Sequence, residues 1–442
     1  MVTTLDTVVV GAGISGLAYA HARGPEAEIV VLEAAARPGG LVQTERGGPN
    51  GQWRYEVGPE SLRFEVKGGL TDMLGELGLA AHKPPGSAGQ RFLVCKGRLV
   101  DAPLAPHKFL MSPLMTLRGK LRMAMEPFRD PKVGNDGSVA EFVRHRIGQE
   151  ALDAMLDPLV SGIHAGDPEQ LSMRACFPRL VDLVEAHGGL FKALFKTRGE
   201  PAPSVMKPEG GCQSVTDALA RKLGSRVRLS TPVSSIARDG ERWRVTSPAG
   251  EFSARRVVLA VSAPTAARLL SGLAPDLARI VGTIRCENVV SCVHVRRRED
   301  VGHSLAGFGY LVASREKLHH LGTLFSSSIA PDACDPGHVV LRTLIGGSRH
   351  ADLIDASEAE LLGIVRDEVG RLLSLKGEPV FTAIQRWRAT LPRFDLDHPA
   401  RVRAIENATP PGLGLAGNWL KGIGVNHLAA SARELAASHA KA

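Results

Sequence analysis

The sequence lacks the features that mark several large classes of protein. Its six cysteines form no C-x-x-C pair, so in a chain of 442 residues they predict reduced thiols and argue against a disulfide framework. There is no apolar run of about 18 residues, the length needed for a helix that crosses a bilayer. The first residues lack a positive segment and include Asp6, so no secretory signal is expected.

Metal-binding and nucleophilic motifs are also missing. The histidines do not have the spacing of metal ligands, because His319 and His320 are adjacent while His164 and His187 are isolated. No arrangement of a nucleophile with a base stands out. We therefore predict no metal site and no catalytic side chain, and we expect these histidines to be surface or core residues.

Positive charge is concentrated in one part of the chain. The formal net charge is +8, and residues 91–146 hold 11 Lys and Arg against 5 Asp and Glu, a local excess of 6. This distribution predicts one basic face that suits an anionic ligand or a membrane surface, and it argues against a nucleic-acid-binding protein. An ordinary solvated face explains the same charges equally well.

Glycine, by contrast, is abundant at 48 residues, and its first cluster has a nucleotide-binding pattern. Residues 7–10 predict a strand, residues 11–16 have the order G-x-G-x-x-G, residues 17–23 begin a helix, and residues 28–32 predict a second strand that ends at Glu33. In such a unit the glycines allow a tight turn, close approach to a pyrophosphate and close packing of the helix. The acid accepts the ribose hydroxyls. The motif fits NAD and FAD alike.

A second group of glycines favours FAD. Residues 37–40 read Arg-Pro-Gly-Gly directly after Glu33, and Gly58-Pro59 follow Glu56-Val57. Extra backbone donors behind the ribose acid suit a long, buried dinucleotide, although either pair alone is also compatible with a simple turn.

The rest of the chain alternates between helical and strand-like patterns. Residues 101–128 are rich in Pro, Met and bases, and residues 114–128 predict an amphipathic helix that suits a membrane interface or, equally, a buried helix edged with solvated bases. Residues 138–198 predict further helices. The apolar run at 257–261 predicts a strand that returns to a buried parallel sheet.

The later segments complete a predicted multidomain α/β fold. Residues 280–345 alternate in strand fashion, residues 357–374 predict an amphipathic helix, and a strand, a glycine turn and a helix end the chain. We predict a discontinuous Rossmann-like nucleotide-binding domain closed by the C-terminus, an inserted α+β substrate domain, and a helical domain that is the candidate membrane-facing part. Their ranges are 1–82, 201–271 and 385–442 for the first, 83–100 and 272–384 for the second, and 101–200 for the third.

With these motifs the sequence resembles the flavin-dependent protoporphyrinogen and coproporphyrinogen oxidases of haem synthesis, within the monoamine-oxidase-like FAD superfamily. The resemblance covers nearly the whole chain. The glycine motifs at 11–16, 37–40 and 417–425 are similar to the superfamily in general. The runs LVSGIHAGDP at 159–168 and CFPRL at 176–180 are similar to the porphyrinogen oxidases in particular.

The resemblance implies a set of site residues. It places Arg91 opposite a substrate carboxylate, Phe308 and Leu311 along a flat tetrapyrrole slot, Leu344 on the other side of that slot, and Gly166 at a turn beside the flavin. The motifs and the resemblance together predict non-covalent FAD held by Gly11, Gly13, Ile14, Ser15, Gly16, Glu33, Arg37, Gly39, Gly40, Gly58, Pro59, Val233, Gly417, Asn418, Ile423, Gly424 and Val425.

The implied reaction is oxidation of a porphyrinogen to the porphyrin in three two-electron steps, with protoporphyrinogen IX as the expected substrate and coproporphyrinogen III as the alternative. The flavin accepts hydride, and O2 takes the electrons and forms H2O2. The protein then has only to hold an apolar disc and anchor its propionates, so no acid–base pair is required. The implied location is the cytoplasm. Peripheral contact with an anionic membrane and a homodimer stay open.

Two other kinds of function stay open at this point. An amine oxidase or a carotenoid-type desaturase would share the fold, but Arg91, the run at 159–180 and the lack of a C-terminal cysteine to tether a flavin argue against them. A flavin-binding regulatory or membrane-scaffold protein would use the basic face instead. The intact phosphate motif together with an apolar slot disfavours that second alternative.

Overall fold

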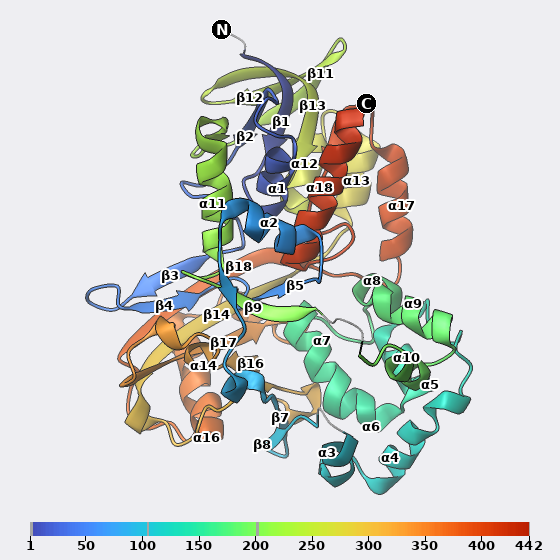
Figure 1. Cartoon of the computed structure of the whole chain (residues 1–442), viewed down its shortest axis with the longest axis vertical. Helices are drawn as coiled ribbons and strands as arrows, with labels where there is room; N and C mark the ends of the chain where they lie inside the picture. The colour runs from blue at the N-terminus through green and yellow to red at the C-terminus, as the bar shows by residue number, and fades with distance from the viewer. Residues whose placement is uncertain (1–2, 104–105, 200–202, 442) are drawn as a thin grey trace.

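The computed structural model describes residues 3–103, 106–199 and 203–441. It contains two seven-stranded sheets, one in the upper half of the molecule and one at the lower left in Figure 1. A group of helices from the middle of the chain lies at the lower right. Both ends of the chain lie near the top, so the C-terminal segment returns to the part where the N-terminal strand begins.

The first sheet has the strand order β10-β2-β1-β13-β12-β11, with β19 also paired to β13. The strands β10, β2, β1, β13 and β19 are parallel, whereas β12 and β11 extend the sheet as antiparallel neighbours of β13. The bounds are β1 Thr3–Val10, β2 Ile29–Leu32, β10 Val227–Arg228, β11 Ser235–Asp239, β12 Arg242–Ser247, β13 Gly250–Leu259 and β19 Leu413–Leu415.

Helices cover both faces of this sheet, which explains why its central strands are apolar on both sides. In β1, Val8 and Val10 face one core while Val9 faces the other. The first core is closed by α12 Ala263–Leu270, α13 Pro275–Gly282 and α17 His398–Ala408. The second is closed by α1 Ile14–Ala22, α2 Gly69–Leu77, α11 Gln213–Leu223 and α18 Val425–Lys441.

The second sheet has the order β18-β14-β17-β16-β15-β7-β8. One face packs against three consecutive helical segments, α15 Glu358–Ile364, the π-helical turn η10 Val365–Val369 and α16 Gly370–Leu373. The strand bounds are β7 Phe92–Cys95, β8 Arg98–Asp101, β14 Cys286–Arg297, β15 Gly309–Leu311, β16 His320–Leu324, β17 His338–Gly346 and β18 Phe381–Pro392.

Two small sheets connect these parts. The hairpin β3 Thr44–Gly47 and β4 Trp53–Glu56 lies beside the second sheet, and β5 Leu62–Phe64, β9 Ser204–Pro208 and β6 Ala81–His82 form a three-stranded ribbon. The short helix α14 Ser326–Ile329 follows β16.

The helical part has its own apolar core, and its helices begin at recognisable caps. Thr116 caps the start of α4, and Ser138 forms a capping box with Glu141 at the start of α5. The bounds are α3 Pro106–Met111, α4 Leu117–Ala124, α5 Val139–Arg146, α6 Gln149–Ala151, α7 Asp157–His164, α8 Met173–Cys176, α9 Pro178–His187 and α10 Leu190–Lys196. In the described part of the chain, none of the helices has the length and apolar character of a membrane span.

The predicted α/β class is confirmed, and the main differences lie at element boundaries. The first helix starts at Ile14 and not at residue 17, because Gly13 already serves as its N-cap. The helix predicted at 357–374 is interrupted by the turn η10. Although the predicted substrate domain resumes at 272, Leu277 and Val281 of α13 pack in the core of the first sheet. The division into domains stays a prediction.

Candidate flavin and substrate site

The glycine turn after β1 has the geometry that a dinucleotide requires. Gly11 has φ +103°, and a Cβ added to it would lie 2.5 Å from the carbonyl oxygen of Ala260. A Cβ on Gly16 would lie 2.0 Å from the carbonyl oxygen of Gly11, so helix α1 packs on the sheet only because this residue is glycine. At Gly13 an added Cβ meets nothing within 4 Å. The backbone at the N-terminus of α1 is therefore open toward a ligand, and an anionic group fits there.

The predicted second glycine pair folds directly against this turn. The Gly39 N–H donates to the carbonyl oxygen of Ala12 at 2.7 Å, and a Cβ on Gly40 would lie 3.3 Å from the Cα of Gly13. The Arg37 guanidinium donates to the carbonyl oxygens of Pro38 and Gly40 at 3.0 and 2.7 Å, and burial lowers its pKa. In this structure Arg37 therefore shapes the loop.

Glu33 lies at the end of β2, as the sequence predicts. Its two carboxylate oxygens accept the N–H groups of Ala12 at 2.7 Å and Ala35 at 2.8 Å. These bonds hold the carboxylate beside the glycine turn, and each oxygen keeps a further lone pair for a ribose hydroxyl. The segment that contains Val233 lies against the end of β2. Its Thr231 N–H donates to the carbonyl oxygen of Glu33 at 2.7 Å, and Val233, two residues later, is buried.

The C-terminal cofactor residues follow β19 and lead into α18. The Asn418 side chain donates to the Thr390 carbonyl oxygen at 2.9 Å. Trp419 is fully buried, and its indole N–H donates to the Val261 carbonyl oxygen at 2.8 Å. A Cβ on Gly417 would lie 2.0 Å from the Trp419 indole nitrogen. Ile423 and Gly424 immediately precede the first residue of α18, Val425.

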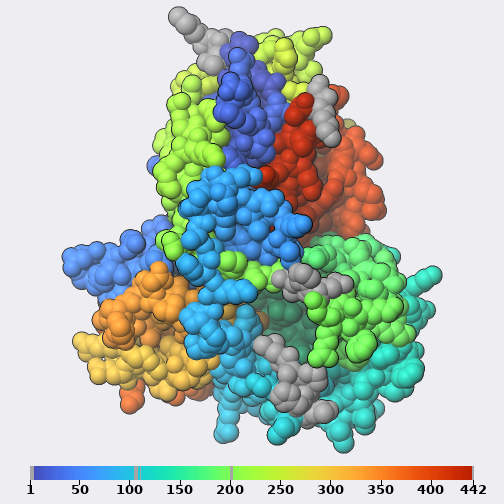
Figure 2. All heavy atoms as spheres, viewed as in Figure 1, coloured from blue at the N-terminus to red at the C-terminus, as the bar shows by residue number. Residues whose placement is uncertain are grey.

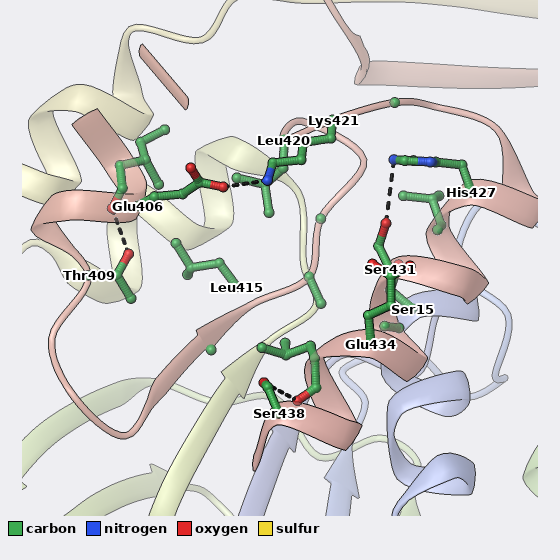
Figure 3. A pocket seen from close by; sticks show the side chains of 18 of the residues that line it. Ser15, Glu406, Thr409, Leu415, Leu420, Lys421, His427, Ser431, Glu434 and Ser438 are labelled. Carbon is green, nitrogen blue, oxygen red and sulfur yellow. Dashed lines mark hydrogen bonds and ion pairs between the residues drawn. The ribbon is translucent and has the colours of Figure 1, made fainter. Parts of the chain in front are cut away.

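A cavity of about 440 Å³ lies behind this segment, between α17, β19 and α18 (Figure 3). Ser15 and Gly417 are among its lining residues. The rim carries an ion pair between Lys421 and Glu406 at 2.6 Å. Two predicted cofactor residues, Ser15 and Gly417, therefore line the same cavity. Gly13 is not one of its lining residues.

A buried group of four charges lies under Gly58 and Pro59. The Lys207 ammonium lies 2.8 Å from the Glu56 carboxylate and 3.5 Å from that of Glu60, and the Arg342 guanidinium lies 3.4 Å from Glu60. Arg342 and the Trp387 indole both donate to the Val57 carbonyl oxygen, at 3.1 and 2.7 Å. We call Glu56, Glu60, Lys207 and Arg342 the buried quartet; it fixes the backbone next to Gly58.

The charges of the quartet stabilise one another. Burial lowers the pKa of Arg342, and Glu60 and Glu56 oppose that shift. For Lys207 burial also favours the neutral amine, but the neighbouring Glu60, Cys212 and Glu56 outweigh it and hold the pKa above its usual value. The sequence alone does not reveal this quartet. The only local indication in the sequence is that three members of the quartet, Glu56, Lys207 and Arg342, are charged residues within strands.

Leu311 and Leu344 line one face of the second sheet. Leu311 pairs with Gly322, and Gly322 pairs with Leu344, so the three residues form one row across β15, β16 and β17. Directly paired residues point to the same face, and the central glycine keeps the row flat between two half-buried leucines. Gly322 was not predicted. An isolated glycine within a strand pattern was the available signal.

Arg91 and Phe308 come together at the β7–β15 end of this sheet. The guanidinium carbon of Arg91 lies 4.5 Å from the centre of the Phe308 ring, and one Nη donates to the Gly89 carbonyl oxygen at 2.7 Å. Burial lowers the pKa of Arg91. The resemblance places Arg91 opposite a substrate carboxylate and Phe308 along the tetrapyrrole slot, and here the two residues form one cation–aromatic unit.

Gly166 lies near the Leu344 end of the row, next to Ala165. It follows Ala165, which has φ +51° and packs in one apolar cluster with Leu344. A Cβ on Gly162 of α7 would lie 2.5 Å from a methyl group of Leu311. Helix α7 thus closes over the row, and the structure brings Gly166, Leu311 and Leu344 into one neighbourhood.

Two of the histidines, His164 and His320, are buried in the core. His164 is buried between the rings of Phe177 and Phe394, with centroids 5.7 and 6.2 Å away, and burial lowers its pKa to about 4. It is therefore neutral near pH 7. His320 is also buried, and its ring nitrogens bond Glu368 at 2.7 Å and the Tyr310 hydroxyl at 2.9 Å.

Comparisons with known proteins show the family to which the chain belongs. A family model described as flavin containing amine oxidoreductase matches residues 14–437. The chloroplastic protoporphyrinogen oxidase of Oryza sativa subsp. japonica is 31% identical over 98% of this chain and 87% of its own length. The coproporphyrinogen III oxidase of Bacillus subtilis (strain 168) is 26% identical over 95% and 94% of the two chains. A crystal structure from Exiguobacterium sp. 255-15 covers 100% of both chains with 25% identity and a TM-score of 0.85.

Proposed function

We propose that this chain, which belongs to the flavin containing amine oxidoreductase family, uses bound FAD to oxidise a porphyrinogen to the porphyrin in haem synthesis. The observation that carries the proposal is the flat row of Leu311, Gly322 and Leu344 on a sheet whose end carries Arg91 over Phe308. Protoporphyrinogen IX is the first candidate substrate, because the Oryza sativa relative named protoporphyrinogen oxidase is 31% identical to this chain, against 26% for the coproporphyrinogen III oxidase.

The residues present fit FAD. The open backbone at Gly13, the carboxylate of Glu33 and the N-terminus of α1 offer donors and acceptors for a pyrophosphate and a ribose. When bound, the flavin supplies the two-electron chemistry, in which it accepts a hydride. O2 is the proposed final acceptor and yields H2O2. Since no cysteine follows Cys334 in the sequence, the C-terminal segment has no thiol to tether a flavin, and the cofactor is held non-covalently.

The chain's own part is to bind, orient and exclude water. The row on the second sheet offers an apolar surface to a disc-shaped substrate, and α7 closes over it near Gly162. Arg91 offers a planar pair of N–H donors to a propionate, which fixes the rotation of the disc. Correct placement of the reacting carbon against the cofactor is the catalytic contribution that such residues make.

A turnover experiment tests the proposed function. Purified protein with protoporphyrinogen IX in air should form fluorescent porphyrin faster than the spontaneous reaction, with O2 uptake and H2O2 release. Acid extraction should release intact FAD. Bound flavin without porphyrinogen turnover would favour an amine oxidase or desaturase, and flavin retained on the denatured chain would contradict non-covalent binding.

Changing Arg91 to Ala should weaken substrate binding. A charge-assisted hydrogen bond contributes about 1.5–3 kcal/mol, so we expect KM to rise about ten- to a hundredfold. Because the anchor holds substrate and transition state alike, kcat should change little. Steady-state kinetics with measured flavin content checks this.

Two further variants control the Arg91 experiment. Arg91→Lys keeps the charge and should recover part of the binding. The exposed Arg98 lies on the neighbouring strand β8, and Arg98→Ala should leave KM unchanged. An unchanged KM in Arg91→Ala would move the anchor to another cation, with Arg98 or Lys67 next in line.

We also propose peripheral contact with an anionic membrane at the cytoplasmic face, through α4 and the segments beside it. Met111 is 86% and Phe128 80% exposed, and Leu117, Leu121 and Met125 are exposed between them. Among the bases of residues 101–128, Lys108 and Arg118 are exposed, whereas Arg122 donates to the carbonyl oxygens of residues 144–146 at the end of α5. An exposed apolar patch edged with bases is typical of interfacial helices.

Vesicle flotation tests this contact. The protein should float with vesicles that contain phosphatidylglycerol at low salt, and salt should reduce the bound fraction because each base contributes about 1 kcal/mol of screened attraction. Leu121→Asp should reduce binding at both salt concentrations. Failure of the wild-type protein to bind at low salt would mean that these bases only solvate a helix.

A further inference from the structure

The ribbon of β5 and β9 presents a cation on the face turned away from the nucleotide-binding core. In its register Leu62 pairs with Met206 and Arg63 pairs with Val205. Leu62 and Met206 pack in the core with α2 and α18. Because side chains alternate along a strand, Arg63 and Val205 point to the opposite side. They stay exposed there, with 59% of the Arg63 side chain and 38% of Val205 accessible.

That opposite side faces the second sheet. Lys207 lies two residues after Val205, on the same face of β9, and reaches Glu60. The Glu60 carboxylate accepts the Ser326 hydroxyl at 3.1 Å, and the neighbouring Phe325 N–H donates to the carbonyl oxygen of Phe308 at 3.0 Å. The ribbon and the loop of Phe308 and Arg91 are therefore joined at this point.

Arg63 lies one strand repeat, about 7 Å, beyond that junction. Figure 2 shows the surface hollowed between the light-blue segment around residue 90 and the green segment around residue 190. Arg63 shares the Glu65 carboxylate with Arg179 of α9, so it lies next to the helices on the green side of this hollow. Arg91 belongs to the light-blue side, so the two arginines are on different walls.

The Arg63 guanidinium has both the positive charge and the unpaired donors that an anion requires. Its Nε lies 3.4 Å from one oxygen of Glu65, and the other oxygen of Glu65 lies 3.0 Å from Arg179 at the start of α9. Two guanidinium groups thus share one carboxylate, which leaves a formal excess of one positive charge. Among the described residues, the two Nη groups of Arg63 have no partner. This planar pair of donors matches a carboxylate.

We propose that Arg63 forms a second carboxylate subsite, across from Arg91, which binds a propionate on the far rim of the substrate. The proposal rests on the proposed function and specifies its selectivity. Coproporphyrinogen III carries propionates at the two positions where protoporphyrinogen IX carries vinyl groups. The subsite therefore strengthens the binding of coproporphyrinogen III, which has four carboxylates. It adds nothing to the binding of protoporphyrinogen IX, which has two.

Binding of the porphyrin products tests the subsite without turnover. Dissociation constants for coproporphyrin III and protoporphyrin IX are measured on the FAD-loaded enzyme by fluorescence titration. Arg63→Ala should weaken coproporphyrin III binding about two- to fivefold, the upper part of the range for a partly exposed ion pair, and should change protoporphyrin IX binding less than about twofold. Arg63→Lys should lose less. Arg279, an exposed arginine on α13, gives the control Arg279→Ala, which should change neither.

A second variant separates binding from structure. Glu65→Gln removes the carboxylate that competes for Arg63, so coproporphyrin III should bind more tightly, which loss of structure would not produce. Equal changes for both porphyrins in Arg63→Ala, or no tightening in Glu65→Gln, would overturn the subsite. Failure of the wild-type enzyme to bind either porphyrin would contradict the proposed function itself, whereas normal wild-type turnover with an inert Arg63 would contradict the subsite alone.

Discussion

Arg342→Met should destabilise the protein by about 3–5 kcal/mol, the usual cost of breaking a buried ion pair by removing one partner. Without Arg342 the buried quartet holds two carboxylates and one ammonium, and Glu60 keeps only the cation of Lys207. The variant also loses a donor to the carbonyl oxygen of Val57, so the backbone beside Gly58 is less well held. We expect a lower unfolding midpoint in denaturant and weaker flavin binding.

The double variant Arg342→Met/Glu60→Gln is the matched control. It removes one positive and one negative charge, so the remaining Glu56–Lys207 pair is again neutral. If the penalty comes from uncompensated charge, the double variant should be more stable than Arg342→Met alone, as a double-mutant cycle would measure. Equal stability of the two variants would mean that lost packing, and not charge, determines the cost.

The buried quartet also shows why part of the site was not predictable from the sequence. Its members come from three stretches of chain, β4 with the loop after it, β9 and β17, and each stretch is more than a hundred residues from the next. Each charge by itself resembles a surface residue of a strand. Only the register that places Arg342 beside Val57 and Lys207 beside Glu60 makes them a unit, and long-range pairing of this kind leaves no local periodicity.

The nucleotide turn was predictable for the opposite reason. Gly11, Gly13, Gly16 and Glu33 act within one βαβ unit, so their spacing already fixes their relative positions. The row of Leu311, Gly322 and Leu344 was predictable only in part. Leu311 and Leu344 came from the resemblance to a family, whereas Gly322, which completes their row, became visible only through the pairing of β15, β16 and β17.

Gly16→Ala should abolish stable FAD binding, because no adjustment of a side chain can make room for the added methyl group. The new Cβ would lie 2.0 Å from the backbone oxygen of Gly11 and 3.1 Å from a methyl group of Val9. Helix α1 would have to move away from β1, and its N-terminus would move with it. Overpacking lowers the free energy of unfolding by about 1–3 kcal/mol. We expect a loss at the upper end of this range, because the contact is with the backbone. Flavin absorbance after purification and the unfolding midpoint measure both effects.

Two other glycines separate the fold from the cofactor in this experiment. At Gly13 an added Cβ meets no protein atom within 4 Å, so Gly13→Ala should leave the apoprotein as stable as the wild type and still weaken FAD binding, since the methyl group enters the ligand's space. Gly75 lies inside α2 with the same open surroundings, and Gly75→Ala should keep full flavin content and gain about 1 kcal/mol from helix propensity. Full flavin loading in Gly16→Ala would contradict the argument that the third glycine sets the position of α1. Loss of stability in Gly13→Ala would mean that this residue serves the fold and not the ligand.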